Sequence, residues 1–192
     1  PTLGIPLMGH TINVLSDGNL VIYGGKTTNG TLSNTLWHYN VTSEKWSAKA
    51  TQSQVVPPKI YQHTLTLAGD YLYLFGGTLP YGNFSHQMFR IHTRGFEEWE
   101  SIEYPGNPLF ITGHSMVYYE EINVLMLFGG ISRDVARFSR LSSLIYEFDL
   151  ESQRWTQMKL PQRAKNPLAN SYLPPERAFH SAHIMGTYMA VD

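Results

Sequence analysis

Histidine is the residue type in this 192-residue sequence that is best suited to metal binding or catalysis. The chain has eight histidines and no cysteine, so a metal site would need imidazole and carboxylate ligands, and thiolate chemistry is excluded. Four of the histidines, each followed by Ser or Thr, recur along the chain: His10, His63, His114 and His180. The histidines form no compact ligand set, and His180 and His183 would point to opposite faces of a strand. We therefore predict that the repeated histidines are structural, with ring nitrogens bonded to the backbone of a neighbouring unit, and that the protein holds no metal or cofactor.

Motifs for covalent or phosphate chemistry are absent from the sequence. It contains no Gly-x-Ser-x-Gly nucleophile motif, no phosphate-binding glycine loop and no Gly-x-Gly-x-x-Gly motif. Its glycine pairs stand at the ends of apolar runs and are followed by loop-like segments, not by helices. We therefore predict that the protein is not an enzyme.

Basic side chains are distributed unevenly along the chain. Lys and Arg total 14 and Asp and Glu total 15, so no overall positive field indicates nucleic acid or an anionic membrane. Residues 131–180 nevertheless hold eight basic against five acidic residues. Two long segments, 131–143 and 160–177, carry the six predicted partner-binding residues: Arg133, Arg137, Arg140, Arg163, Lys165 and Arg177. Because arginine can hold a carboxylate or sulfate with two hydrogen bonds, we predict an acidic protein or glycan surface as the partner, with ordinary solvated charge as the alternative.

Three Asn-x-Ser/Thr motifs predict glycosylation. Their asparagines are Asn29, Asn40 and Asn83, and all three fall where loops are expected. Glycans at these positions would indicate a secreted protein or an ectodomain.

A repeat of about 50 residues must position these candidates. An apolar run ending in two glycines occurs three times, at Gly24 and Gly25, at Gly76 and Gly77, and at Gly129 and Gly130. A tryptophan follows each glycine pair: Trp46, Trp99 and Trp155. We expect the glycines to occupy a crowded crossing with positive φ, and the tryptophans to pack between neighbouring units. The units cover about residues 9–50, 62–103 and 113–159, with half of a fourth in 179–192, all within one domain of residues 1–192.

Each unit is predicted to contain four short antiparallel strands separated by turns, which makes the fold class all-β. No segment of 11 or more residues has helical periodicity, and at most one helical turn is expected within residues 134–140. The loops after the second and fourth strands should emerge on one rim. The basic segments 131–143 and 160–177 would therefore share this rim with Asn29 and Asn83, whereas Asn40 would lie on the other.

The Gly-Gly and Trp motifs at this period resemble the kelch family. Within that family, residues 174–186 and 188–191 are similar to the extracellular kelch propellers of attractin and the multiple-EGF-domain proteins, although Asp192 stands where a tyrosine and two glycines are expected. The resemblance implies a kelch-type β-propeller with three four-stranded blades and half of a fourth. Since closed propellers have four to eight blades, it also implies that the remaining blades belong to a longer chain.

The resemblance implies a non-enzymatic scaffold that presents loops to a protein partner in a large secreted or cell-surface protein. Two alternatives stay open. One is an intracellular, cytoplasmic kelch adaptor that recruits ubiquitin-ligase substrates or binds the cytoskeleton. The other is an oxidase-type propeller whose active residues lie outside this stretch, because the family's copper oxidases need a Cys–Tyr crosslink that a cysteine-free chain cannot form. The longest apolar run has about five residues, which predicts no membrane insertion by this stretch.

Overall fold

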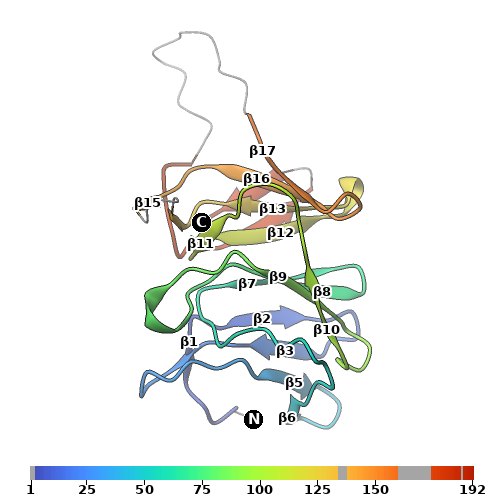
Figure 1. Ribbon diagram of the computed structural model, residues 1–192. Helices are drawn as coiled ribbons and strands as arrows, with labels where there is room; N and C mark the ends of the chain where they lie inside the picture. The colour runs from blue at the N-terminus through green and yellow to red at the C-terminus, as the bar shows by residue number, and fades with distance from the viewer. Residues whose placement is uncertain (1–2, 134–137, 160–173, 187) are drawn as a thin grey trace.

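The computed structural model describes residues 3–133, 138–159, 174–186 and 188–192. These residues form antiparallel sheets that stack one beside another along the chain order (Figure 1). Three of the stacked sheets have four strands each, and the last sheet of the stack has two. This arrangement confirms the expected all-β, partial propeller, with three complete blades and half of another. No helix in the described ranges is long and apolar enough to cross a membrane.

The strands of each sheet follow one another in sequence order from the inner to the outer edge. Blade 1 contains β2 (Thr11–Val14), β3 (Leu20–Tyr23), β5 (Leu36–Asn40) and β6 (Lys45–Lys49). Blade 2 contains β7 (Thr64–Ala68), β8 (Tyr71–Phe75), β9 (Met88–His92) and β10 (Trp99–Ile102). Blade 3 contains β12 (Ser115–Tyr119), β13 (Val124–Phe128), β16 (Ile145–Asp149) and β17 (Arg154–Gln157). Half-blade 4 contains β18 (Ala182–Met185) and β19 (Tyr188–Val191).

Short ribbons lie beside the blades, where the connection after a blade's second strand meets the segment that enters the inner strand of the same blade. In blade 1, β1 (Leu7–Met8) pairs with β4 (Lys26–Thr27). In blade 3, β14 (Ile131–Arg133) pairs with both β11 (Phe110–Thr112) and β15 (Ser139–Leu141). Two single-turn 3-10 helices, η1 (Pro80–Gly82) and η2 (Glu120–Ile122), complete the described elements.

The β14–β15 ribbon corrects the prediction that residues 131–143 form a long loop. Both ends of this segment are strands, because β11 offers backbone partners that a free loop would lack. The helical turn expected within residues 134–140 is wrong at its C-terminal end, where Ser139 and Arg140 are in β15. Residues 134–137 lie outside the described part of the chain.

The core lies between blades, since neighbouring sheets pack face to face and blade 2 buries both of its faces. Leu65, Leu72 and Trp99 of blade 2 pack with Val21 and Tyr23 of blade 1 in a single apolar cluster. A second cluster joins blades 2 and 3 in the same way. The inner strands β2, β7, β12 and β18 are adjacent in that order. In β8 alternate residues therefore face opposite neighbours, with Leu72 and Leu74 packed toward blade 1 and Tyr73 and Phe75 toward blade 3, and this burial holds the stack together.

The three repeat tryptophans differ in their surroundings. Trp99 is 4% exposed, and its ring centroid lies 5.2 Å from that of Tyr23 in blade 1. Trp155 lies 4.8 Å from the ring of Phe75 in blade 2. Trp46, like Trp155, is half-buried, but its ring contact is with Tyr39 of its own sheet, with centroids 5.0 Å apart. The difference arises because, within the described residues, no sheet precedes blade 1.

Candidate partner-binding rim

The repeated histidines form hydrogen bonds between blades. His63 Nε2 is bonded to Thr11 Oγ1 of blade 1 at 3.2 Å, and His114 Nε2 is bonded to Thr64 Oγ1 of blade 2 at 3.0 Å. His180 Nε2 repeats the contact with Ser115 Oγ at 2.8 Å. The hydroxyl residue that follows His10, His63 or His114 thus contacts the repeated histidine of the next blade. The structure places a side-chain hydroxyl at each of these three Nε2 atoms. The predicted backbone contact with a neighbouring blade is present beside it for two of the rings, from His63 to Tyr23 and from His180 to Phe128.

Burial keeps these rings neutral. Desolvation lowers the pKa of His63 to about 3, and the positive form of nearby His10 adds to the effect. Burial likewise lowers the pKa of His114 to about 3, helped by His63 and His180. In the described ranges, no three His, Asp or Glu side chains gather as a possible metal-ligand set. The rings therefore act as uncharged links between blades.

The glycine pairs occupy the space beside these rings. A Cβ on Gly24 would lie 2.7 Å from Cε1 of His63, and one on Gly25 would lie 2.9 Å from Cβ of His10. Gly76 and Gly77, and then Gly129 and Gly130, repeat the arrangement with the next histidines. All six glycines have positive φ. The first glycine of each pair leaves room for the following blade's histidine, and the second leaves room for its own blade's histidine.

A backbone bond explains the position of one predicted binding residue. The second glycine of a pair donates to the carbonyl three residues before the next histidine, which is Ile60 after Gly25 and Arg177 after Gly130, each at 2.8 Å. Arg177 therefore occupies the position of a buried isoleucine in the first junction. Its Nε donates to the Pro175 carbonyl at 3.4 Å, and its side chain is half-buried. Arg177 thus combines a junction position with a charge at the surface.

The other predicted basic residues differ in their contacts and exposure. The guanidinium of Arg133, at the end of β14, lies 4.2 Å from the ring centroid of Phe84 and donates to the Gly82 carbonyl at 3.4 Å. These contacts tie blade 3 to the β8–β9 connection of blade 2, with a cation–π contribution of about 0.5–1 kcal/mol. Arg140 is exposed on β15. The remaining three predicted residues lie outside the described ranges: Arg137, Arg163 and Lys165.

Sequence reasoning missed further binding candidates on the side of the blades that carries Arg133. A pocket of about 350 Å³ between the connections of blades 1 and 2 is lined by Lys26, Lys59, Tyr61 and Tyr81. The ammonium of Lys26 lies 5.5 Å from the ring centroid of Tyr61. Tyr81, within η1, is fully exposed and has φ of +64°. The sequence did contain a signal for Lys26. This residue directly follows a glycine pair and so begins a loop after a second strand.

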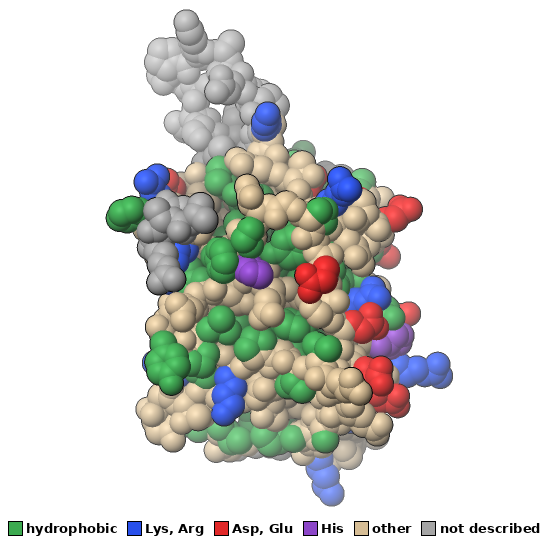
Figure 2. Space-filling view, in the orientation of Figure 1, with side chains coloured by type: hydrophobic (Ala, Val, Ile, Leu, Met, Phe, Trp, Pro, Cys, Tyr) green, Lys and Arg blue, Asp and Glu red, His purple; other side chains and the backbone are tan. Residues whose placement is uncertain are grey.

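The two rims of the arc carry opposite charge. We call the side with connections after second and fourth strands the basic rim. Its described basic residues are Lys26, Lys59, Arg133, Arg140, Lys159 and Arg177, and its described acidic residues are Glu103, Glu176 and Asp192. We call the other side the acidic rim. Its turns and adjoining strand ends carry nine acidic residues, Asp17, Glu44, Asp70, Glu97, Glu98, Glu120, Glu121, Asp149 and Glu151. The basic residues there are Lys45, Arg94 and Arg154. Figure 2 shows acidic side chains mainly along the right-hand edge, where β12 and β13 are joined in Figure 1. The rims therefore present different surfaces to partners.

The glycosylation candidates lie in the expected connections. Asn29 and Asn83 are exposed between β3 and β5 and between β8 and β9, on the basic rim. Asn40 ends β5 on the acidic rim, is half-buried, and accepts a hydrogen bond from the Ser43 N–H at 2.8 Å. Glycosylation at these positions stays a prediction.

Comparison with known proteins agrees with this architecture. Residues 4–192 match the attractin/LZTR1 β-propeller family. Multiple epidermal growth factor-like domains protein 8 of Mus musculus is 36% identical over 183 residues, which are 91% of this chain and 6% of that protein. The leucine-zipper-like transcriptional regulator 1 homolog of Drosophila melanogaster is 27% identical over 189 residues, which are 94% of this chain and 18% of that protein. The chain thus spans only a small part of the length of these relatives. On the match over almost its whole length, the chain belongs to the attractin/LZTR1 β-propeller family.

Proposed function

We propose that this chain is a non-enzymatic protein-interaction module of an extracellular or cell-surface protein, and that its basic rim docks an acidic partner surface. The opposite charge of the two rims carries the proposal, because it gives the module one side that attracts acidic groups and one that repels them. Connections on a rigid blade scaffold are the usual location of recognition.

The geometry of the basic rim supports docking in two ways. Arg133 is held against Phe84, so part of the surface is ordered before a partner arrives. Lys26 and Lys59 have no ion pair within the described residues and stand beside the exposed ring of Tyr81. The exposed ring offers apolar contact of a kind that is enriched at protein interfaces, and the two lysines add charge that steers an acidic partner.

The free face of blade 1 supports the proposal that further blades exist in the longer protein. Ile12 and Val14 are 56% and 64% exposed, and they occupy the positions at which β7 directs Leu65 and Leu67 toward blade 1. Since the equivalent residues of blade 2 are packed by a preceding sheet, we propose another blade as the occupant of this face. That blade would bring to His10 the hydroxyl contact that, among the described residues, is made by the other three repeated histidines.

A second candidate is an intracellular adaptor, which the similarity to a relative named as a transcriptional regulator favours. Glycosylation discriminates between the two settings, because the Asn-linked glycan is added in the secretory pathway.

We expect charge reversal on the basic rim to slow association with an acidic probe. The triple variant Lys26→Glu, Lys59→Glu, Arg140→Glu should bind a poly-L-glutamate chain with an association rate at least fivefold lower at low salt, while dissociation changes less. Biolayer interferometry at low and high salt measures both rates. The matched control reverses Lys45 and Arg154 on the acidic rim and should change binding little. Equal losses for the two variants would contradict docking at the basic rim.

We also expect the protein to carry glycans when it is expressed through a secretory pathway. Enzymatic removal of Asn-linked glycans should lower its mass, and Thr31→Ala should remove only the contribution of Asn29 because it breaks that motif and leaves the asparagine in place. Mass spectrometry of the intact protein measures each loss. If glycan removal leaves the mass unchanged, the extracellular setting loses its main support and the intracellular adaptor becomes the better proposal.

A further inference from the structure

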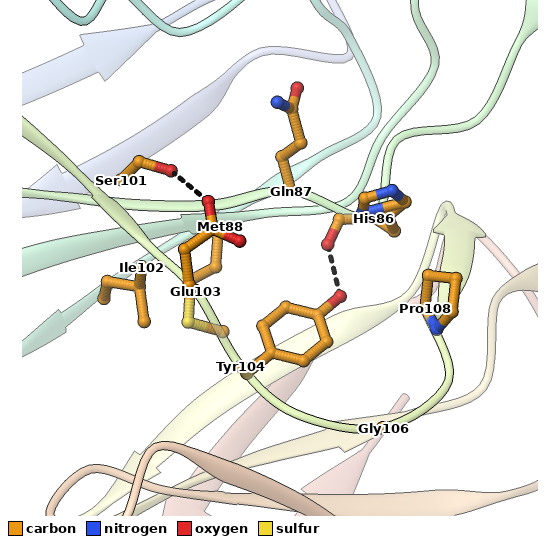
Figure 3. A pocket seen from close by; sticks show the side chains of 9 residues that line it. All are labelled: His86, Gln87, Met88, Ser101, Ile102, Glu103, Tyr104, Gly106 and Pro108. Atoms are coloured by element: carbon orange, nitrogen blue, oxygen red, sulfur yellow. Dashed lines mark hydrogen bonds between the residues drawn. The ribbon is translucent and has the colours of Figure 1, made fainter.

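A small pocket on blade 2 has fixed walls and, among the described residues that line it, a single acidic group. It has a volume of about 260 Å³ and lies between the start of β9, the end of β10 and the segment that leads to β11 (Figure 3). The Tyr104 hydroxyl donates a hydrogen bond to the His86 carbonyl across it. The ring of Phe110 stands edge-on to the His86 ring, with centroids 4.6 Å apart. These contacts join two segments nearly 20 residues apart and hold the pocket open before any ligand enters.

The pocket combines an apolar floor with hydrogen-bond acceptors. Met88 and Ile102 are 1% and 7% exposed. Glu103 is exposed at the mouth, and its Oε1 accepts a weak hydrogen bond from the Ser101 hydroxyl at 3.5 Å. Figure 3 shows the Glu103 carboxylate on the side of the pocket opposite the His86 ring. The carboxylate has no ion pair within the described part of the chain.

The ionisation states leave one net negative charge at this site. Burial lowers the pKa of His86, and nearby Glu103 opposes that shift only partly, so the imidazole is neutral near pH 7 and has one nitrogen that accepts a hydrogen bond. Burial raises the pKa of Tyr104 to about 12, so its phenol is also neutral. Among the described residues, no Lys or Arg lines the pocket. The site therefore favours a cation that donates hydrogen bonds.

We propose that this pocket receives an arginine side chain of a protein partner. Its volume is below the range of sites for drug-sized ligands and suits one long side chain. The aliphatic stem would contact Met88 and Ile102, the guanidinium would bond Glu103, and its plane would stack on the ring of Tyr104 or His86. The pocket lies on the basic rim but selects a cation, so it is independent of the acidic surface proposed above. It would give the rim a contact of opposite polarity and hence fix the orientation of a partner.

Titration of the isotope-labelled 192-residue chain with N-acetyl-arginine methylamide tests the proposal. We expect saturable shifts of backbone amide NMR signals confined to residues 86–88 and 101–108. The neutral isostere N-acetyl-citrulline methylamide, which has the same shape without the charge, should bind at least fivefold more weakly. Glu103→Gln should weaken arginine binding by at least fivefold, and because Glu103 is exposed the variant should stay folded, which the dispersion of its NMR spectrum shows.

Two controls make the result specific. Glu98→Gln, at an exposed glutamate on the acidic rim, should leave binding unchanged. Tyr104→Phe should weaken it without altering the charge, because the bond that orders the wall is lost. Equal affinity for arginine and citrulline, equal affinity for the corresponding lysine probe, or shifts located elsewhere in the chain would each overturn the assignment. None of these outcomes depends on whether the basic rim docks an acidic partner.

Discussion

Acidification from pH 7 to pH 4.5 is expected to lower the free energy of unfolding by about 5 kcal/mol through two histidines, His63 and His114. Burial lowers the pKa of each to about 3, whereas an unfolded chain has histidine pKa values of about 6.5. Between these values the unfolded state binds more protons than the folded state, so stability falls as the pH falls. Each histidine contributes about 1.4 kcal/mol per pH unit in this window. The expected loss is comparable to the whole stability of many domains.

Urea denaturation followed by tryptophan fluorescence at several pH values between 7 and 4.5 measures this effect. The double variant His63→Gln, His114→Gln should unfold at a lower urea concentration at pH 7 but show a much smaller change on acidification, because its junctions no longer take up protons. His183→Gln is the control, since His183 is exposed on β18 and belongs to no blade junction. A midpoint that stays constant from pH 7 to pH 4.5 in the unmodified chain would show that these rings are not held neutral by burial.

Replacement of Gly76 by alanine is expected to cost about 2–5 kcal/mol of folding stability. The position has φ of +63°, which for alanine costs about 1–2 kcal/mol. The new Cβ would also lie 2.6 Å from Cε1 of His114 and 2.7 Å from the Ile111 carbonyl oxygen, and such overpacking typically costs about 1–3 kcal/mol. Because one of the two neighbours is backbone, a change of side-chain rotamer cannot remove the clash.

The chain offers a matched control for this substitution. Gly69 also has positive φ, +57°, but a Cβ there would meet no atom within 4 Å. Gly69→Ala should therefore show only the backbone part of the cost, about 1–2 kcal/mol. The difference between the two variants, taken from urea midpoints at one pH, isolates the contact with the next blade. Similar losses for both would mean that the glycine pairs serve only backbone conformation, and not the close approach of blades.

Local sequence patterns were enough to predict the blades of this protein. Three features recur at about 50 residues, and each meets one local requirement that is the same in every blade. The glycine pairs allow positive φ at a strand end, the His-Ser/Thr pairs supply a hydroxyl on the inner strand, and the tryptophans supply a large apolar side chain. Strand periodicity then assigns one side chain in two to each face. The all-β class and the number of blades follow from such short-range requirements, which any one repeat displays by itself.

Contacts between repeats were decided only by the tertiary structure. His63 bonds the hydroxyl of Thr11, 52 residues away, and no local pattern predicts a side-chain hydroxyl at this ring. The same limit applies to β14, whose strand form depends on β11 from the preceding connection. The binding candidates Lys26, Lys59 and Tyr81 come together, as do His86 and Tyr104, because separate connections meet at one rim. The sequence determines which side chains each connection carries. The packing of one blade against the next determines which of these side chains share a pocket, because that packing is a property of the assembled stack and not of any single repeat.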